Sequence, residues 1–416
     1  MKKDVLSNQF TFIDVFSGAG GLSEGFTRAG FTGLAHIEAD SSAAYTLKTR
    51  LAREYLHQSG KGKIYESYLK KEIERSELWQ NVPSELLESV INRVIDRESV
   101  SEIKRSITVN TQGKKIDVLI GGPPCQAYSL VGRSRDPNRM VGDSRNYLFR
   151  LYAEFLKTFK PKFFVFENVL GLLSAGSKAY LNEMVSLFES SGYSVDHSVL
   201  AAEDFGVLQR RKRVIVIGRR GRRRFLFPKL KKLEGDWQTK RDIFADLPIL
   251  PPGGVNELAA YTRPPSKYLS ETGIRNGGTF TTQHVCRPHN ERDLEIYAIT
   301  IEKWLSEGKR LKYDELPQRL RTHNNISGFL DRFKVIDPNG LSHTVVAHIA
   351  KDGHYYIYPD SNQVRSISVR EAARIQSFPD DYFFEGGRTA AFRQIGNAVP
   401  PLMARAIADY LKSELS

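Results

Sequence analysis

Cysteine is scarce in this chain, since only Cys125 and Cys286 occur among its 416 residues. Two thiols cannot form a disulfide framework, and they are too far apart in sequence for a paired-cysteine zinc site. So few thiols in a chain of this size fit a reducing cytoplasm. The sequence therefore excludes a small secreted domain that depends on disulfides.

Long apolar runs are also missing. No stretch approaches the roughly 18–20 residues that a helix needs to span a bilayer. The first ten residues, MKKDVLSNQF, are too few and too polar for a signal peptide. No internal repeat or long low-complexity tract is visible. We therefore expect a soluble, cytoplasmic protein with no membrane partner.

Acidic residues are fewer than basic ones: the chain has 48 Asp and Glu and 61 Lys and Arg, which gives a formal net charge of +13. An excess of this sign favours a polyanionic partner, since each neutralised phosphate releases counterions. An enzyme that is merely basic would carry the same charge, so net charge alone leaves both readings open.

The length predicts two domains. The first half alternates short β-rich runs with helical patterns, which predicts a parallel sheet with helices on its faces. We expect helices near 22–30 and 146–160, ended by Gly30 and Pro161, and two more at about 368–383 and 400–415. The expected strands are 10–16, 33–40, 115–122, 162–169 and 213–218.

Three further segments interrupt this rhythm. The charged, helix-favouring stretch 51–114 predicts a helical insertion, and a solvated decoration is its simplest interpretation. After residue 218, the basic run RRGRRRFLFPKLKK leads to LPILPPGG at 247–254, a pattern typical of a stiff hinge. Residues 255–365 are polar and aromatic with weak periodicity, which suits a second, recognition-type domain.

A glycine-rich turn follows the first strand, in FIDVFSGAGGLSEGF at 12–26. Gly18, Gly20 and Gly21 would let backbone amides approach a ligand, and Glu38 ends the next strand, where a carboxylate can accept from ribose hydroxyls. Phe16 is placed to stack on an adenine. Without a GK[ST] ending, the pattern favours an adenosine-type ligand such as S-adenosylmethionine over NAD. A tight structural turn with a surface Glu is the alternative.

Side chains that could take part in catalysis lie at the ends of three other strands. Cys125 comes just after 115–122, in PPCQAYS, where two prolines fix the turn. Glu167 ends the strand 162–169, and Arg213 stands at the mouth of 213–218. We expect these three side chains to face one cleft. A buried, inert thiol and a hydrogen-bonded structural Glu are the alternatives.

Together these segments resemble the bacterial DNA cytosine-5 methyltransferase family. The resemblance covers most of 10–50, 115–220 and 365–410 and is weak over 51–114 and 255–330. Its blocks occur here in order as FIDVFSGAGG, GGPPCQAYS, DSRNYLF, FENV, QRRKR, REAARIQSFP and RQIGNAVPP.

The resemblance implies a Rossmann-like α/β domain that uses S-adenosylmethionine, joined to a smaller target-recognition domain. In it Cys125 resembles the nucleophile that adds to C6 of a flipped-out cytosine. Glu167 resembles the donor to N3, and Arg213 the contact to O2. Arg211, grouped with these catalytic residues, matches those that support the flipped nucleotide or its phosphates, as do Gln126 and Ser129.

The same matching implies six cofactor-site residues: Phe16, Gly18, Gly20, Glu38, Leu148 and Asn397, the last in a block that positions the cysteine loop. Arg374 and Gln376 resemble structural residues that tie the domains together. One departure concerns the acidic residue that usually contacts the adenine, because its nearest counterpart, in KIYESYLK at 63–70, is Ser67.

The resemblance also implies an organisation and partners. We expect a catalytic domain from 1–240 plus 385–416, a recognition domain at 241–384, and double-stranded DNA in the cleft between them. A monomer that protects host DNA, with a separate cognate endonuclease, is typical of the family. Alternatives are a tRNA cytosine-5 methyltransferase, an inactive binding protein, and zinc binding by His284, Cys286 and His289, although no metal is expected.

Overall fold

The computed structural model describes residues 10–124, 148–174, 179–322 and 330–416. Seven strands form one sheet in the order β3-β2-β1-β4-β5-β8-β6. The first five run parallel, and β8 is antiparallel to both of its neighbours. The sequence predicts an α/β fold with a parallel sheet, and the antiparallel β8 makes the observed sheet mixed but mostly parallel. Its strands are β1 (Thr11–Val15), β2 (Thr32–Glu38), β3 (Val90–Asn92), β4 (Val118–Gly121), β5 (Phe163–Asn168), β6 (Tyr193–Ala201) and β8 (Lys212–Arg220).

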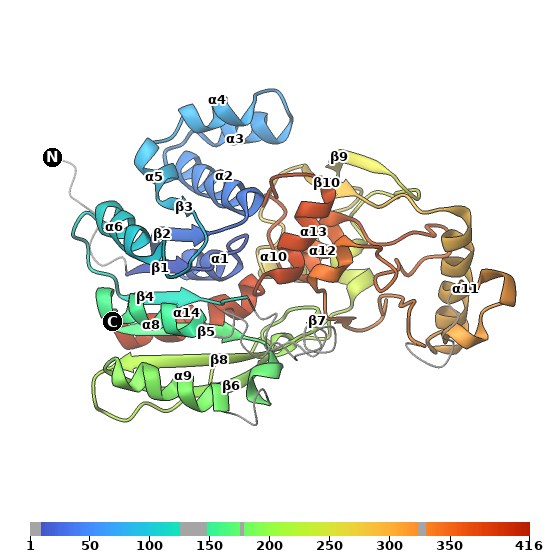
Figure 1. Ribbon diagram of the computed structural model, residues 1–416. Helices are drawn as coiled ribbons and strands as arrows, with labels where there is room; N and C mark the ends of the chain where they lie inside the picture. The colour runs from blue at the N-terminus through green and yellow to red at the C-terminus, as the bar shows by residue number, and fades with distance from the viewer. Residues whose placement is uncertain (1–9, 125–147, 175–178, 323–329) are drawn as a thin grey trace.

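Helices cover both faces of this sheet (Figure 1). Side chains of successive strand residues point to opposite faces, so Leu119 packs in one core cluster while Val118 and Ile120 pack in the other. The first face is covered by α6 (Val100–Thr111), α8 (Leu148–Phe159) and α9 (Ala179–Ser190). The second is covered by α1 (Gly21–Arg28) and α14 (Pro401–Leu415).

All five predicted strands and the four predicted helices are present, but the third helix, predicted at 368–383, is the shorter α12 (Val369–Ile375). The expectation for 51–114 is wrong in one respect. Its first part is helical, through the end of α2 (Ser41–Gln58), α3 (Gly62–Leu69), α4 (Arg75–Gln80) and α5 (Ser84–Glu88). Its second part is no solvated decoration, because β3 pairs with β2 and Ile103 and Ile107 of α6 lie in the main core.

A second region lies beside the sheet (Figure 1). It contains an antiparallel hairpin and helices that pack on two further core clusters. Its elements are a short helix at Thr239–Phe244, β9 (Val255–Ala260), α10 (Lys267–Glu271), β10 (Phe280–Val285), α11 (Glu291–Glu307), β11 (Ser342–His343), α12 and α13 (Arg388–Asn397).

Two strand residues connect this region to the sheet. The short β7 (Gln209–Arg210), directly before β8, pairs in parallel with β11.

Ala391, Phe392 and Ile395 of α13 belong to the same core cluster as α12, whereas α14 packs on α1. The chain therefore leaves the packing of the second region between α13 and α14.

Within the described part of the chain, no helix is both long enough and apolar enough to cross a lipid bilayer.

Candidate active site

The strand register gathers the predicted residues at one edge of the sheet. Val15 pairs with Ile37 on one side and with Gly121 on the other, and Gly121 pairs with Phe166. The segments that follow β1, β2, β4 and β5 therefore emerge together at the carboxyl ends of the parallel strands. That edge is where open α/β sheets bind ligands.

The glycine-rich turn after β1 is held by Glu38. The Gly18 amide donates to Glu38 Oε2 at 2.7 Å, and the Asp40 amide donates to Oε1 at 2.7 Å. Burial raises the pKa of Glu38, although these two amides favour its charged form. Phe16 adopts a left-handed conformation with φ of 63°, which is uncommon for an aromatic residue and typical of functional turns.

Gly20 is required by both conformation and space. Its φ is 80°, and a Cβ there would lie 2.8 Å from Leu47 Cδ2 and 2.9 Å from the Tyr382 hydroxyl. That hydroxyl donates to the carbonyl of Ala19 in the same turn. Tyr382 belongs to the second region, so this region helps to shape the glycine turn, a role that the sequence did not predict.

A buried polar cluster supports the turn from below. The Ser23 hydroxyl bonds to Asp14 Oδ2 at 2.5 Å and to His36 Nδ1 at 3.1 Å. Burial raises the pKa of Asp14 to about 8 against the opposing hydrogen bond from Ser23, and the charge of Glu38 adds to the rise. Burial also lowers the pKa of His36 to about 4. Both groups are therefore mainly uncharged near pH 7, which reduces the cost of burying them.

Ser67, the nearest counterpart of the acidic residue that the family uses to contact the adenine, lies on no strand of the sheet. Ser67 lies in helix α3, where its hydroxyl donates to Glu72. The strand next to β2 is β3, which ends at Asn92. The side-chain amide of Asn92 donates to the main-chain carbonyls of Glu38 at 2.8 Å and Ala39 at 3.1 Å. Asn92 thus holds the turn that carries Glu38, a role that the sequence does not predict because β3 is only three residues long and lies within a charged stretch.

Glu167 and Arg213 form an ion pair at the far side of the same edge. Arg213 Nε lies 2.8 Å from Glu167 Oε1, and the two side chains are 12% and 13% exposed. The pair arises because β5 and β8 are antiparallel neighbours, with Asn168 opposite Val214. The structure therefore brings these two predicted residues together in a largely buried position that is still open to solvent.

Glu167 also faces the turn that leads to Cys125. A Cβ on Gly122 would lie 2.7 Å from Glu167 Oε2, so only glycine lets the carboxylate approach so closely. The Asn168 amide donates to the carbonyl of Pro123 at 3.4 Å. Cys125 itself, with Gln126 and Ser129, lies outside the described residues. The described chain approaches this position as far as Pro124.

Arg211 does not occupy a position that faces a substrate. Its side chain is among the most buried in the molecule, at 1% exposure. Its guanidinium donates to main-chain carbonyls of Val345 at 2.7 Å, Ala398 at 2.9 Å and Gly396 at 3.3 Å. These contacts tie β7 and β8 to the second region and to the RQIGNAVPP block, which supports a positioning role for Arg211, while its role at the flipped nucleotide or its phosphates stays a prediction.

The remaining predicted residues lie on helix ends. Leu148 is half-buried at the first turn of α8, and Asn397 is exposed at the last residue of α13. Gln376 does link parts of the chain, since it bonds to Gln209 and to the carbonyl of Ala398. Arg374 was expected to tie the domains together, but its partners Asp246, Asp380 and Ile243 all lie within the second region.

The three residues named as possible zinc ligands each have a different hydrogen-bond partner. His284 bonds to the Ser368 hydroxyl at 2.9 Å, Cys286 donates to the Pro251 carbonyl at 3.2 Å, and His289 bonds to the Ser366 hydroxyl at 2.9 Å. The described residues contain no group of three or more His, Cys, Asp or Glu that could hold a metal ion.

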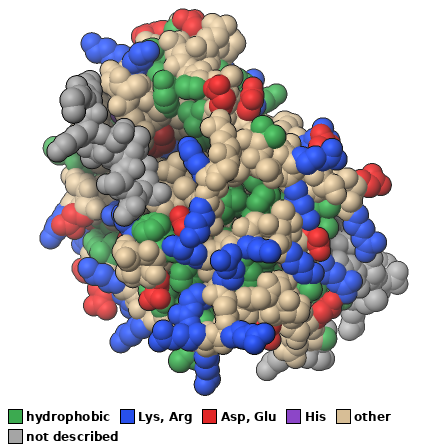
Figure 2. All heavy atoms as spheres, turned by 90° about the vertical axis from the view of Figure 1, so that its left-hand side faces the viewer, with side chains coloured by type: hydrophobic (Ala, Val, Ile, Leu, Met, Phe, Trp, Pro, Cys, Tyr) green, Lys and Arg blue, Asp and Glu red, His purple; other side chains and the backbone are tan. Residues whose placement is uncertain are grey.

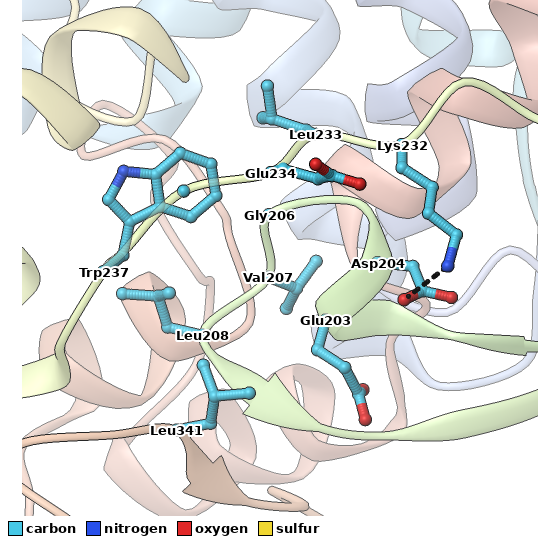
Figure 3. Close-up of a pocket in the computed structure, with 11 residues that line it drawn as sticks. Glu203, Asp204, Gly206, Val207, Leu208, Lys232, Leu233, Glu234, Trp237 and Leu341 are labelled. Carbon is cyan, nitrogen blue, oxygen red and sulfur yellow. Dashed lines mark ion pairs between the residues drawn. The ribbon is translucent and has the colours of Figure 1, made fainter.

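A hollow of about 260 Å³ lies beside the segment that leads into β7 (Figure 3). It is lined by Trp237, Leu208 and Leu341 and by Asp204 and Lys232, whose side chains form an ion pair with an N–O distance of 3.1 Å. None of the predicted site residues lines it. Its lining comes from both regions, since Leu208 precedes β7 and Leu341 precedes β11.

The C-5 cytosine-specific DNA methylase model matches residues 10–78 and 75–413. The chain therefore belongs to this family, and it is a DNA cytosine-5 methyltransferase of the type II restriction-modification kind. This assignment favours DNA over the tRNA alternative, and an enzyme over an inactive binding protein.

Curated relatives match over nearly their whole length. The chain is 42% identical to the type II methyltransferase M.Bpa9945I of Bacillus paralicheniformis, over 97% of this chain and 99% of that protein. It is 34% identical to M.DdeI of Desulfomicrobium norvegicum, over 95% and 87%. A prophage-encoded E. coli protein described as a DNA modification methyltransferase has the same fold, with a TM-score of 0.61 and 24% identity over 98% and 99%.

Proposed function

We propose that the chain transfers a methyl group from S-adenosylmethionine to C5 of a cytosine in duplex DNA through a covalent adduct of Cys125 with C6. The observation that carries this proposal is the Glu167–Arg213 pair beside the turn that leads to Cys125. In the same proposal the enzyme acts as a monomer, and methylation of host DNA protects it from a separate cognate endonuclease.

The geometry of the glycine turn fits the proposed cofactor. Gly18 has φ of 55° with open space where a Cβ would stand, so its surface can accept a ligand. Glu38 would accept from the ribose hydroxyls, and Phe16 would pack on the adenine, with Leu148 and Asn397 at the rim. S-adenosylmethionine supplies an electrophilic methyl group when it is bound. The Asn92 amide would keep Glu38 in the required position.

Asn92→Ala should weaken cofactor binding without slowing the chemical step. The variant loses the hydrogen bonds to the carbonyls of Glu38 and Ala39, each worth about 0.5–1.5 kcal/mol, so the KM for S-adenosylmethionine should rise roughly 3- to 10-fold at constant kcat. Steady-state methyl transfer measures both constants. Asn81→Ala, which removes a surface bond within the insertion, is the matched control. An unchanged KM would contradict the positioning role.

The catalytic residues have complementary tasks in this proposal. The Glu167 carboxylate first takes up a proton from water, and the resulting carboxyl passes it to N3 while the Cys125 thiolate adds to C6 of the cytosine. Arg213 neutralises charge that builds up at O2. The electron pair released toward C5 makes this carbon nucleophilic toward a methyl group. Loss of the C5 proton then returns a pair to the ring, which expels the thiolate and lets N3 release its proton.

The cytosine must leave the base stack before this chemistry, because the faces of C5 and C6 are covered within a duplex. We propose that DNA lies between a catalytic domain of residues 1–240 plus 385–416 and a recognition domain at 241–384. Gln126 and Ser129 would support the flipped nucleotide, and Arg211 would hold the two domains in register through its carbonyl contacts.

Methyl transfer from labelled S-adenosylmethionine tests this function directly. Mixed-sequence duplex DNA and tRNA serve as parallel substrates, followed by base-resolution mapping of 5-methylcytosine. We expect label in DNA at one recurring short sequence. Label in tRNA alone would overturn the proposed substrate, and label in neither would overturn the activity of the isolated chain.

Cys125→Ser should abolish turnover and leave cofactor affinity nearly intact. A serine hydroxyl is far less ionised than a thiol at neutral pH and adds poorly to C6. Duplex DNA that contains 5-fluorocytosine provides a second readout, because fluorine cannot leave as a cation and the adduct should persist in denaturing gels. Cys286→Ser is the control, since Cys286 is buried and bonded to Pro251. Substantial methylation by the Cys125 variant would contradict the nucleophile assignment.

A further inference from the structure

The amino ends of the parallel strands form a strongly basic surface, opposite the edge that carries Glu167. Residue Lys115 precedes β4, Lys162 precedes β5, and the loop RRGRRR at 219–224 begins at the end of antiparallel β8. The register joins them, since Val118 pairs with Phe163 and Phe163 with Arg219. We define this surface, the basic edge, as the five arginines of 219–224 with Lys114, Lys115, Lys157, Lys160 and Lys162.

Figure 2 views the molecule from this side, and Lys and Arg side chains gather over the lower half of the face. Two carboxylates of the described residues pair with lysines of the basic edge: Asp117 lies 3.6 Å from Lys162, and Glu154 lies 3.7 Å from Lys157. After these are subtracted, the basic edge still supplies more than half of the formal net charge of +13.

The loop is built to present its last three arginines outward. Arg219 donates to the carbonyls of Arg223 at 3.1 Å and Arg224 at 3.5 Å, and Arg220 donates to the carbonyl of Lys160. Arg222, Arg223 and Arg224 are exposed, and their side chains form no ion pair with any described residue. Two arginines thus brace the backbone, while three guanidinium groups face solvent without a counter-charge.

We propose that the basic edge binds the phosphate backbone of a second duplex segment while the catalytic edge holds the target. Guanidinium groups match phosphate oxygens in pairs, and contacts to phosphate bind without reading sequence. The enzyme acts on a long polymer, so a second segment of the same molecule is always near. The inference goes beyond methyl transfer and depends on it only through the presence of DNA.

Bridging of two duplexes tests the proposal. Purified protein is bound to a biotinylated 40-base-pair duplex on beads, and retention of a fluorescein-labelled mixed-sequence duplex is measured against salt. We expect wild-type protein to retain the second duplex. The variant R222S/R223S/R224S should retain at least tenfold less, with a log–log salt slope flatter by about 0.9 for each lost phosphate contact.

K61S/K63S/K71S removes the same charge from exposed positions on the insertion and should bridge like wild type. Equal methylation of a short duplex by all three proteins shows that each is folded, and it separates failure of this proposal from failure of the proposed chemistry. Absence of bridging by the wild type, unchanged bridging by the arginine variant, or equal loss in the lysine variant would overturn the inference. Capture of phosphatidylglycerol–phosphatidylcholine (1:3) vesicles without capture of duplex would overturn it in favour of a lipid surface.

Discussion

Glu167→Gln should reduce kcat by about 10²- to 10⁴-fold, the usual contribution of a positioned proton donor. The amide is nearly isosteric, so its oxygen can still accept from Arg213 Nε, which now lies 2.8 Å from Glu167 Oε1. What the variant loses is the ability to transfer a proton to N3. Attack on C6 then builds negative charge in the ring that protonation of N3 no longer neutralises, so the barrier to adduct formation rises.

Single-turnover methylation and equilibrium binding of S-adenosylmethionine measure this effect separately. The dissociation constant for the cofactor should stay within about twofold, since Glu38 and the glycine turn are untouched. Glu203→Gln serves as control, because Glu203 accepts from the Arg211 amide near the same strands without facing the turn that leads to Cys125. A Glu167 variant with nearly full kcat would contradict the assigned role of this carboxyl group.

Arg213 offers an internal check on the same geometry. In the described structure its Nε holds Glu167 and its Nη1 donates to the carbonyl of Lys212 at 2.9 Å, so in the proposed role Nη2 is the nitrogen that would reach a base oxygen. Lysine at this position would keep the charge and lose the fork that serves both partners at once. The two residues are therefore expected to act as one unit, and their substitutions should be strongly non-additive.

The sequence predicts the strands that are buried on both faces, because such strands are continuous apolar runs. It fails for β3, which has three residues within a charged stretch, and for β6, an edge strand whose side chains are largely half-exposed. The same failure hides the role of Asn92, because this residue ends a strand that the sequence does not predict. Strand pairing is a long-range property that a local pattern does not carry.

Within the site, residue types were easier to predict than burial. Arg210, Arg211, Lys212 and Arg213 are consecutive basic residues, yet the structure exposes Arg210 and Lys212, buries Arg211 and pairs Arg213 with Glu167. Successive side chains of a strand point to opposite faces, which is why exposed and buried residues alternate here. The burial of the Arg211 guanidinium is favourable only because the second region lies against it. The carbonyls that bind it come from residues 345, 396 and 398, more than 130 positions away.

A comparable network of buried charge holds the second region together and gives the largest expected effect on stability. Arg374 is fully buried and bonds to Asp246 and Asp380, which are themselves almost completely buried. Burial alone would raise the pKa of Asp380, but the charge and hydrogen bonds of Arg374 outweigh it and lower this pKa. Arg374→Met should therefore cost about 3–5 kcal/mol of unfolding free energy at pH 7, because two carboxylates lose their common partner.

The pH dependence of this loss has a defined sign. In the wild type a depressed pKa stabilises the fold above the unfolded-state value, and this contribution disappears as pH falls through the folded-state value. In the variant the buried Asp380 resists ionisation, so protonation relieves the strain. The difference in unfolding free energy between the two proteins should thus be largest near neutral pH and shrink as pH falls toward the carboxyl range.

Urea unfolding followed by circular dichroism at pH 7 and pH 5 measures both the loss and its trend. Arg292→Met is the control, since Arg292 is exposed and pairs with Asp293 at 3.4 Å on the surface of α11, where the loss of an ion pair changes stability little. The double variant R374M/D380N should recover part of the loss by removing one unpaired charge. Equal stability of Arg374→Met and wild type at pH 7 would mean that the second region does not depend on this buried network.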